Sequence, residues 1–369
     1  MTARVGHTGL DEDDVRVRAG RGSRPRTRRR PEHAEAVSAF VVAVDRGRYR
    51  CMIGGDPDIG ATEGPVGLVT AMKARELGRG NIVVGDTVAL AGDVSGAAGT
   101  LARVVRVEPR RTVLRRSADD ADPVERVIVA NADQLVIVCA LADPPPRIRL
   151  IDRFLVAAYD AGIEPLLCLT KSDLAGPEEI LPVYAPLGLR SVVLGRPLRK
   201  RVLDRLRDLL ADRVSVLVGH SGVGKSTLVN ALIPDADRAV GDVSPATGRG
   251  RHVSSSVVAL ALPGGGFRGV APPGQPGGGF RGVVPPGQPG ERHGWVIDTP
   301  GLRSFGLGHM SPDRVVQAFP DLAAGTAGCP PGCDHLHPGC ALDDFAVSDS
   351  AKARLDSLRR LLRSREGRS

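Results

Sequence analysis

The chain has 369 residues, a formal net charge of +8 and a hydrophobic fraction of 42%. This length and composition suffice for two or three domains with ordinary cores. The longest apolar runs, such as 134–142, are strand-sized and fall well short of the roughly 18 to 20 residues that span a bilayer. Residues 11–14 are acidic and the N-terminus lacks the apolar core of a secretory signal, so we expect a cytoplasmic protein without membrane association.

Residues 1–36 are predicted to form a basic disordered arm. Eight arginines lie between positions 16 and 30 with no acidic residue among them. Such a segment binds RNA phosphates through contacts that depend on charge rather than on sequence. Either basic end of the chain alone could be a solvated surface, but the two together favour a nucleic acid partner. Aromatic residues make up only 3% of the chain, which argues against base stacking as the main binding mode. The second basic end is a C-terminal helix with leucines at helical spacing and the basic residues Lys352, Arg354, Arg359, Arg360, Arg363, Arg365 and Arg368.

Residues 37–118 are predicted to form a small β domain. Apolar residues alternate along short segments, and glycine and aspartate separate these segments. About five short strands with turn signals are typical of a small barrel such as the OB-fold, whose strand face and loops bind nucleic acid. The expected strands are 39–44, 49–53, 66–71, 83–90 and 101–107.

Residues 124–325 alternate apolar strands with amphipathic helices, a pattern that predicts an α/β domain with a parallel sheet. Ligands of such sheets bind at the carboxyl ends of the strands. The expected strands are 134–142, 164–169, 191–194, 214–218 and 295–297, and the expected helices are 147–161, 199–210 and 226–233.

A possible base-reading motif follows the strand at 164–169. The motif consists of Thr170, Lys171, Ser172 and Asp173. The Asp173 carboxylate can accept hydrogen bonds from N1–H and the exocyclic amine of guanine, whereas adenine offers no such pair. Lys171 would lie over the base plane. Alone this motif is a weak signal, since a solvated turn has the same composition, and residues 193–195 are only a weak prediction for the remaining guanine-contacting loop.

The strongest single motif has the pattern G-x-x-x-x-G-K-S and lies between the strand at 214–218 and the helix at 226–233. Its glycines let backbone N–H groups converge on phosphate oxygens. Lys225 would reach the β and γ phosphates of a nucleotide, and the Ser226 hydroxyl would ligate Mg²⁺. The predicted nucleotide-binding residues here are Gly219, His220, Ser221, Gly222, Val223, Gly224, Lys225, Ser226 and Thr227.

A third motif, Asp298-Thr299-Pro300-Gly301, follows the strand at 295–297. Asp298 would hold Mg²⁺ through water, and the Gly301 N–H would sense the γ phosphate. Many GTPases have glutamine at the next position to orient the attacking water, but this chain has Leu302. His252 is our candidate for that task, with a solvated surface histidine as the alternative.

Residues 263–290 hold two copies of a Gly/Pro-rich repeat. This composition cannot pack a core, so we expect a flexible loop that joins two strands. An arginine–glycine segment in contact with RNA is the alternative.

The order of the motifs is unusual, because the base-reading motif precedes the phosphate loop, whereas ordinary GTPases have the reverse order. A circularly permuted GTPase keeps the site but joins its strands in a different order. The chain resembles the ribosome small-subunit-dependent GTPase family (RsgA/YjeQ). The resemblance rests on this motif order, on the Gly250-Arg251-His252 segment and on a cysteine/histidine cluster near the C-terminus. The resemblance extends from about residue 37 to the C-terminal helix and also supports the OB-like barrel.

The resemblance implies GTP hydrolysis that the small ribosomal subunit stimulates, and a role in late maturation of that subunit. The implied partners are the small subunit and its rRNA, and we expect a monomer. Val253 stands where the family has threonine, so Ser254 and Thr247 both remain candidates for the second Mg²⁺ ligand. Two alternatives are an ATP-using kinase or transporter-type ATPase, and a zinc-bearing RNA-binding protein with GTP as a binding switch and little hydrolysis.

Residues 326–369 are predicted to form a helical zinc-binding domain. Three thiolates and one imidazole suit tetrahedral Zn²⁺, and a reducing cytosol disfavours a disulfide. Four protein ligands leave no open position, so one structural zinc is expected. His337 remains a rival for the third ligand. The predicted ligands, which match the order in the family, are Cys329, Cys333, His335 and Cys340.

Overall fold

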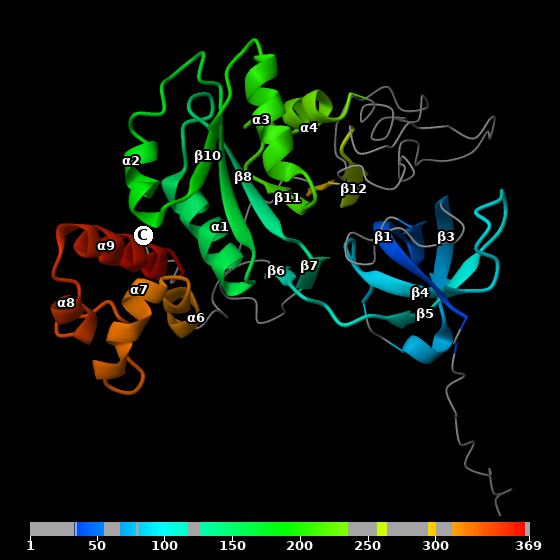
Figure 1. Ribbon diagram of the computed structural model, residues 1–369, viewed down its shortest axis with the longest axis horizontal. Coiled ribbons are helices and arrows are strands. Elements are labelled where there is room, and N and C mark those ends of the chain that lie inside the picture. Colours follow the sequence, from blue (N-terminus) through cyan, green and yellow to red (C-terminus); the bar gives the residue numbers. More distant parts are fainter. Residues whose placement is uncertain are drawn as a thin grey trace, which may run out of the picture. The chain divides into compact units, whose positions relative to one another are not determined.

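The computed structural model describes residues 33, 35–54, 67–78, 81–116, 126–234, 257–263, 294–299 and 312–365, and the residues from Glu35 onward form one unit (Figure 1). The arginine-rich part of the predicted arm, the segment around His252 and nearly all of the Gly/Pro-rich insertion lie outside the described residues. Predictions for those segments are therefore not tested by the fold.

Five strands near the N-terminus close into a barrel, which confirms the predicted β domain. β1 pairs in antiparallel fashion with β2 and with β4, β2 pairs with β3, and β4 pairs with β5. A parallel pairing of β3 with β5 closes the ring. The strands are β1 (Val37–Asp45), β2 (Arg48–Ile53), β3 (Gly67–Lys73), β4 (Thr87–Ala91) and β5 (Ala102–Val107), and a short helical turn (Arg75–Leu77) follows β3.

The fourth strand begins four residues later than the sequence suggested. Gly85 has a φ of +91°, and a Cβ at this position would collide with the Ala130 carbonyl. The buried Asp86 carboxylate that follows accepts hydrogen bonds from the Val83 N–H and from Arg110. Residues 83–86 are thus a turn that contacts the segment after the barrel, and the strand starts once this turn ends.

A two-stranded antiparallel sheet follows the barrel, and the sequence analysis did not predict it. It consists of β6 (Val113–Arg116) and β7 (Arg126–Ala130). The Ala130 N–H donates to the Val84 carbonyl, and the Asn131 amide donates to the Gly85 carbonyl, so this sheet attaches to the barrel turn. Strands this short carry little periodicity of their own, and their pairing is decided by such distant contacts.

The central domain is a sheet with the spatial order β10-β9-β8-β11-β13-β12. The first five strands are parallel, as predicted, and β12 is antiparallel to β13. β12 also pairs with β1 of the barrel, through Val258 and Ala43. The strands are β8 (Gln134–Ala140), β9 (Glu164–Thr170), β10 (Arg190–Val193), β11 (Val214–Val218), β12 (Val258–Ala261) and β13 (Trp295–Asp298).

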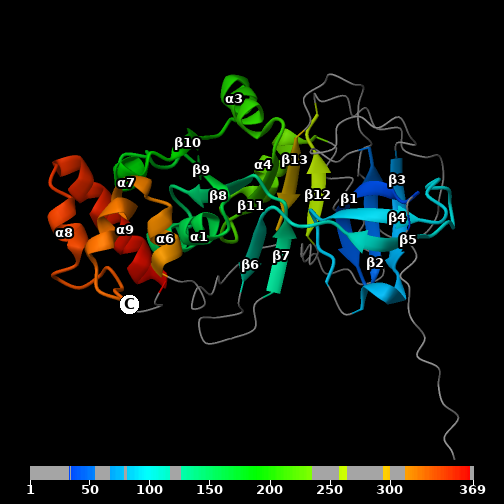
Figure 2. The same ribbon diagram turned by 60° about the horizontal axis from the view of Figure 1, so that its bottom comes forward.

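Helices cover both faces of this sheet, which explains why every residue of β8 and β11 is buried. Alternate residues of β8 face opposite sides: Ile137 packs in the core that includes α1 (Ile148–Asp160), and Val138 packs in the core that includes α3 (Lys200–Leu210) and α4 (Lys225–Leu232). Figure 2 shows α1 and α3 on opposite sides of β8. A further short helix, α2 (Leu181–Tyr184), and a 3₁₀ turn (Ala185–Leu187) precede β10.

The C-terminal region is helical, as predicted. Its helices are α6 (Pro312–Gln317), α7 (Pro320–Ala323) with a 3₁₀ turn (Ala324–Gly328), α8 (Ala341–Phe345) and α9 (Asp349–Arg365). The leucine stripe of α9 is fully buried and belongs to the same core as α1. None of the helices in the described ranges is both long enough and apolar enough to cross a bilayer.

Several basic residues of α9 make contacts within the chain. Arg360 pairs with the buried Asp152 of α1, and its guanidinium also lies 5.2 Å from the centroid of the Tyr184 ring. Arg354 pairs with Asp321, and Arg359 pairs with Asp343. The part of this basic run that is open to a nucleic acid is therefore smaller than the sequence suggested; Lys352 and Arg363 are exposed.

Candidate nucleotide site and metal centre

The topology brings the sequence motifs to one edge of the central sheet. Thr170 ends β9 and residues 171–173 follow it, the phosphate loop follows β11, and Asp298 ends β13. These strands are parallel, and β8 lies between β9 and β11, so their carboxyl ends share an edge. This is the edge at which open α/β sheets bind ligands.

Thr170 links the base-reading motif directly to the phosphate loop. Its hydroxyl donates a hydrogen bond of 2.6 Å to the Val223 carbonyl, and the side chain is buried. The hydroxyl thus provides a polar contact to the loop. The two motifs, which lie more than fifty residues apart in the chain, therefore meet in space.

Asp173 lies at the surface, beside the loop that follows β10. Its Oδ1 accepts a hydrogen bond of 2.7 Å from the Arg196 N–H, and the Ser172 N–H donates to the Leu194 carbonyl. A Cβ on Gly195 would lie 2.6 Å from the Ser172 hydroxyl oxygen. The weakly predicted segment 193–195 is thus in contact with the base-reading motif.

The loop after β8 is a part of the site that the sequence analysis missed. The Lys171 ammonium donates to the Asp143 carbonyl and lies 4.0 Å from the Asp143 carboxylate. A Cβ on Gly222 would lie in van der Waals contact with Pro144, and Pro144 and Arg147 line a small cavity together with residues of the phosphate loop. The available signal was that a buried strand between the two motif-bearing strands must end at the same edge.

The phosphate loop has a backbone conformation that requires glycine at two positions. Gly224 has a φ of +96° immediately before α4, and a Cβ on Gly219 would collide with the Val138 carbonyl. Lys225 begins α4, and its ammonium donates to the Gly219 carbonyl at 2.6 Å and the His220 carbonyl at 3.3 Å. Ser226 and Thr227 are exposed at the start of the helix, where their hydroxyls are open to a ligand.

Lys225 is buried and Asp298 is partly buried, and their opposite charges influence each other. Burial lowers the pKa of Lys225, and the charge of Asp298 opposes that shift. Burial raises the pKa of Asp298, and the charge of Lys225 opposes that shift. Such a pair is poorly solvated and is suited to interact with phosphate and a cation.

Asp298 offers a buried carboxylate oxygen that fits a hard cation. Its Oδ1 is buried and has no hydrogen-bond partner among the residues that the structure describes. Thr299, which the sequence analysis gave no role, fixes this end of β13, because its buried hydroxyl donates to the Leu217 carbonyl at 2.7 Å. Oxygen ligands of this kind are the ones that Mg²⁺ prefers, so the residues fit the predicted cation.

Two predicted residues of this site, His252 and Gly301, lie outside the described residues, as do Leu302 and Val253. Their predicted roles therefore stay predictions.

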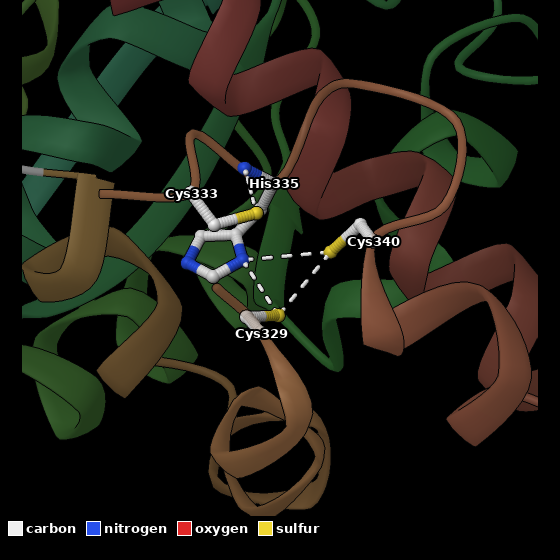
Figure 3. Close-up of side chains that lie close together, drawn as sticks. All are labelled: Cys329, Cys333, His335 and Cys340. Atoms are coloured by element: carbon white, nitrogen blue, oxygen red, sulfur yellow. Dashed lines mark hydrogen bonds between the residues drawn. The ribbon is translucent and has the colours of Figure 1, made fainter. Parts of the chain in front are cut away.

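The four predicted zinc ligands converge in the C-terminal region (Figure 3). The ligand atoms of Cys329, Cys333, His335 and Cys340 all lie within 4.8 Å of one another. Cys329 Sγ, Cys340 Sγ and His335 Nδ1 are each 3.6 Å apart. A tetrahedral zinc with Zn–S of about 2.3 Å and Zn–N of about 2.0 Å has neighbouring ligand atoms about 3.5–3.8 Å apart. The donor set and its spacing therefore fit zinc.

The geometry distinguishes the two histidines of this loop. His335 is 3% exposed and points its Nδ1 at the sulfur atoms, with its Nε2 3.7 Å from the Asp313 carboxylate. His337 is 80% exposed at its side chain and contacts Asp334. His335 also has a φ of +61°, an uncommon conformation for a non-glycine residue that is often retained at functional sites.

Helix α9 contacts the metal-binding loop through Arg359. The Arg359 Nε donates to the His335 carbonyl at 3.0 Å, and its Nη1 donates to Asp343 at 2.7 Å. The hydrogen bond to Asp343 is the largest cause of the raised pKa of Arg359, so the guanidinium stays charged.

Comparison with known proteins agrees with this geometry. The family model described as RsgA GTPase matches residues 107–272. A curated relative from Pseudomonas aeruginosa, named "Small ribosomal subunit biogenesis GTPase RsgA", is 37% identical over 269 residues, which cover 71% of this chain and 69% of the relative. The chain belongs to the RsgA GTPase family. A second relative, "Small ribosomal subunit biogenesis GTPase RsgA 1" from Vibrio vulnificus, is 32% identical over 293 residues, which cover 77% of this chain and 74% of the relative.

Solved structures support the fold of this RsgA-family chain. YjeQ from Thermotoga maritima aligns with a TM-score of 0.57 at 20% identity and covers 90% of this chain and 99% of its own. YloQ, described as a circularly permuted GTPase, aligns with a TM-score of 0.58 at 21% identity. The alignment covers 92% of this chain and 99% of YloQ. The predicted family and architecture are thus confirmed, and as an RsgA GTPase the chain is a GTP hydrolase.

Proposed function

We propose that this chain binds the small ribosomal subunit and hydrolyses GTP during late maturation of that subunit. The observation that carries the enzymatic part is the contact between the base-reading motif and the phosphate loop, through Thr170 and Val223. The biological part is supported by the name that curated relatives bear, small ribosomal subunit biogenesis GTPase.

The residues of the nucleotide site have separate proposed roles. Asp173 reads guanine through its carboxylate, and Lys171 lies against the base. Lys225 neutralises the β and γ phosphates, while Ser226 and Asp298 hold Mg²⁺, directly and through water respectively. When bound, Mg²⁺ would neutralise charge on the phosphates.

We assign two further roles to residues that precede and follow β13 in the sequence. We assign the positioning of the attacking water to His252, because Leu302 has no group that can orient water. The Gly301 N–H senses the γ phosphate. Ser254 and Thr247 are the two candidates for the second Mg²⁺ ligand.

The Cys329, Cys333, His335 and Cys340 cluster holds one structural zinc in this proposal, since four protein ligands leave no open position for chemistry. The C-terminal region directly follows the Asp298 motif in the chain, so loss of the γ phosphate can alter its contacts with RNA. Equal affinity for small subunits with GDP and with a GTP analogue would contradict that coupling.

The basic N-terminal arm and the exposed basic residues of α9 contact rRNA phosphates in this proposal, with an affinity that falls as salt rises. The chain acts as a cytoplasmic monomer. Its proposed domains are 1–36, 37–118, 124–325 and 326–369.

A second candidate function is that of a zinc-bearing RNA-binding protein with GTP as a binding switch and little hydrolysis. The observation in its favour is that Leu302 and Val253 replace residues that support hydrolysis in related sites.

One experiment distinguishes the two functions. GTP turnover is measured with the full chain alone, with purified small subunits and with large subunits as the matched control. The proposed function predicts a rate increase with small subunits only. No increase with small subunits would remove the maturation role, and nucleotide-dependent subunit binding without turnover would favour the binding switch.

A further inference from the structure

The cysteine/histidine cluster has an electrostatic requirement that its four ligands do not meet. Three thiolates and a neutral imidazole around Zn²⁺ leave one net negative charge on the centre. His335 and Cys340 are buried, and a buried charge is costly unless a partner of opposite sign lies close to it. A cation beside the cluster would remove that cost.

Arg359 on α9 is placed to supply this cation. Its side chain is 15% exposed, and its Nε donates to the backbone carbonyl of the ligand His335. The guanidinium therefore contacts the backbone of one of the four cluster residues.

One nitrogen of this guanidinium is still available. Arg359 Nη2 is buried and makes no hydrogen bond to any residue in the described part of the chain. A buried N–H donor is expected to have an acceptor, and a metal-bound thiolate is an acceptor with excess negative charge. Asp343 holds the opposite nitrogen, Nη1, at 2.7 Å and so fixes the plane of the group.

The other arginines of α9 with described side chains do not have this position. Arg354 pairs with Asp321, Arg360 pairs with Asp152, and Arg363 is exposed. The helix as a whole is basic, but Arg359 is the one among these four that contacts a metal ligand.

We propose that Arg359 is a positioning residue of the metal centre, which neutralises the excess charge of the cysteine thiolates and fixes the metal-binding loop to α9. This inference rests on the proposed zinc site. It predicts that Arg359 governs how tightly the loop retains zinc, although it is not itself a ligand. Outer partners of metal ligands typically contribute about 10–100-fold to metal affinity.

The test compares three full-length variants: Arg359→Met, which removes charge and donors, Arg359→Lys, which keeps the charge, and Arg363→Met as a matched control on the same helix. Zinc content is measured after purification, and zinc release is then timed with a chromogenic chelator. We expect release from Arg359→Met to be about 10–100-fold faster than from wild type. The release rate of Arg359→Lys should lie between those of Arg359→Met and wild type, and the release rate of Arg363→Met should match that of wild type.

Absorption spectra of the cobalt-substituted proteins provide a readout that a purely structural role would not change. A hydrogen bond to a thiolate lowers the energy of its lone pair, so losing the bond should move the sulfur-to-cobalt charge-transfer band of Arg359→Met to lower energy. The ligand-field bands should remain those of a tetrahedral site, because the four ligands are unchanged.

Equal zinc release from Arg359→Met and Arg363→Met, with an unmoved charge-transfer band, would overturn the inference. If Arg359→Met does not fold, Arg359→Lys decides: wild-type release and an unmoved band would overturn the inference, whereas faster release with a shifted band supports it. A wild-type chain that binds neither zinc nor cobalt would instead refute the zinc site itself. GTP turnover in that case would leave the proposed nucleotide function standing.

Discussion

The nucleotide site and the metal centre of this RsgA-family chain differ in how the fold assembles them. The nucleotide site takes residues from the ends of separate strands, between Thr170 and Asp298, and depends on the order and register of the sheet. The candidate metal centre takes its four side chains from one loop, between Cys329 and Cys340. We infer that the first depends on tertiary structure, and that the second depends on the metal and on the helices around one loop.

The largest effect is expected from Cys340→Ser. Loss of one of the four ligands should abolish zinc binding. The effect is large because structural zinc contributes on the order of 10 kcal/mol to the stability of such loops. Affinity for GDP should stay within about twofold, because the face of β8, β9 and β11 that packs with α3 and α4 forms a core without any residue of the described C-terminal region. Metal analysis and fluorescent-nucleotide titration check this pair of outcomes. A parallel loss of zinc and nucleotide binding would mean that the two sites are not separable.

The next effect is expected from Lys225→Ala. The ammonium is buried and its charge influences Asp298, and its removal takes away the cation that we assign to the phosphates. We expect the hydrolysis rate to fall about 10²–10³-fold, as for loss of a preorganised donor, with unchanged zinc content. Single-turnover GTP hydrolysis measures the rate. Wild-type turnover would show that Lys225 does not contact the phosphates.

Thr170→Val tests the contact that joins the two nucleotide motifs. The substitution keeps the shape but leaves the Val223 carbonyl without its donor, which costs about 1–3 kcal/mol. The loss should appear both in thermal unfolding and in GDP affinity. Thr170→Ser, which retains the hydroxyl, is the control, and equal behaviour of the two variants would argue against the contact.

The smallest effect is expected from His337→Ala. The side chain is exposed and contacts Asp334 rather than the sulfur atoms. Zinc content and its release rate should equal those of wild type, whereas His335→Ala should lose zinc. Loss of zinc from His337→Ala would instead indicate that His337 is the third ligand.

The parts of the fold that the sequence predicted well are those with local causes. Continuous apolar runs marked β8 and β11 because these strands are buried on both faces, and the phosphate loop marked the start of α4. The spacing from Cys329 to Cys340 predicted that three cysteines and one histidine come together, because all four residues are near in sequence.

The parts that the sequence did not predict depend on distant contacts. The pairing of β6 with β7 and the contact of Lys171 with the loop at Asp143 arise only once the sheet and barrel have formed. The sequence analysis assigned His335 with His337 as its rival, and what separates the two residues is the backbone of the folded loop. Whether Arg360 faces RNA or the buried Asp152 is decided by the packing of α9 on α1.

The most direct test of the assembled nucleotide site is a competition titration of wild-type protein and Asp173→Asn with GTP, ATP and xanthosine triphosphate. An asparagine amide can donate to the 2-oxo group of xanthine but cannot accept both guanine donors as the carboxylate does. We predict that wild-type protein prefers GTP and that the variant shifts its preference to the xanthine nucleotide. Unchanged selectivity for GTP in Asp173→Asn would contradict a site in which residues 170–173 and the phosphate loop surround one guanine nucleotide.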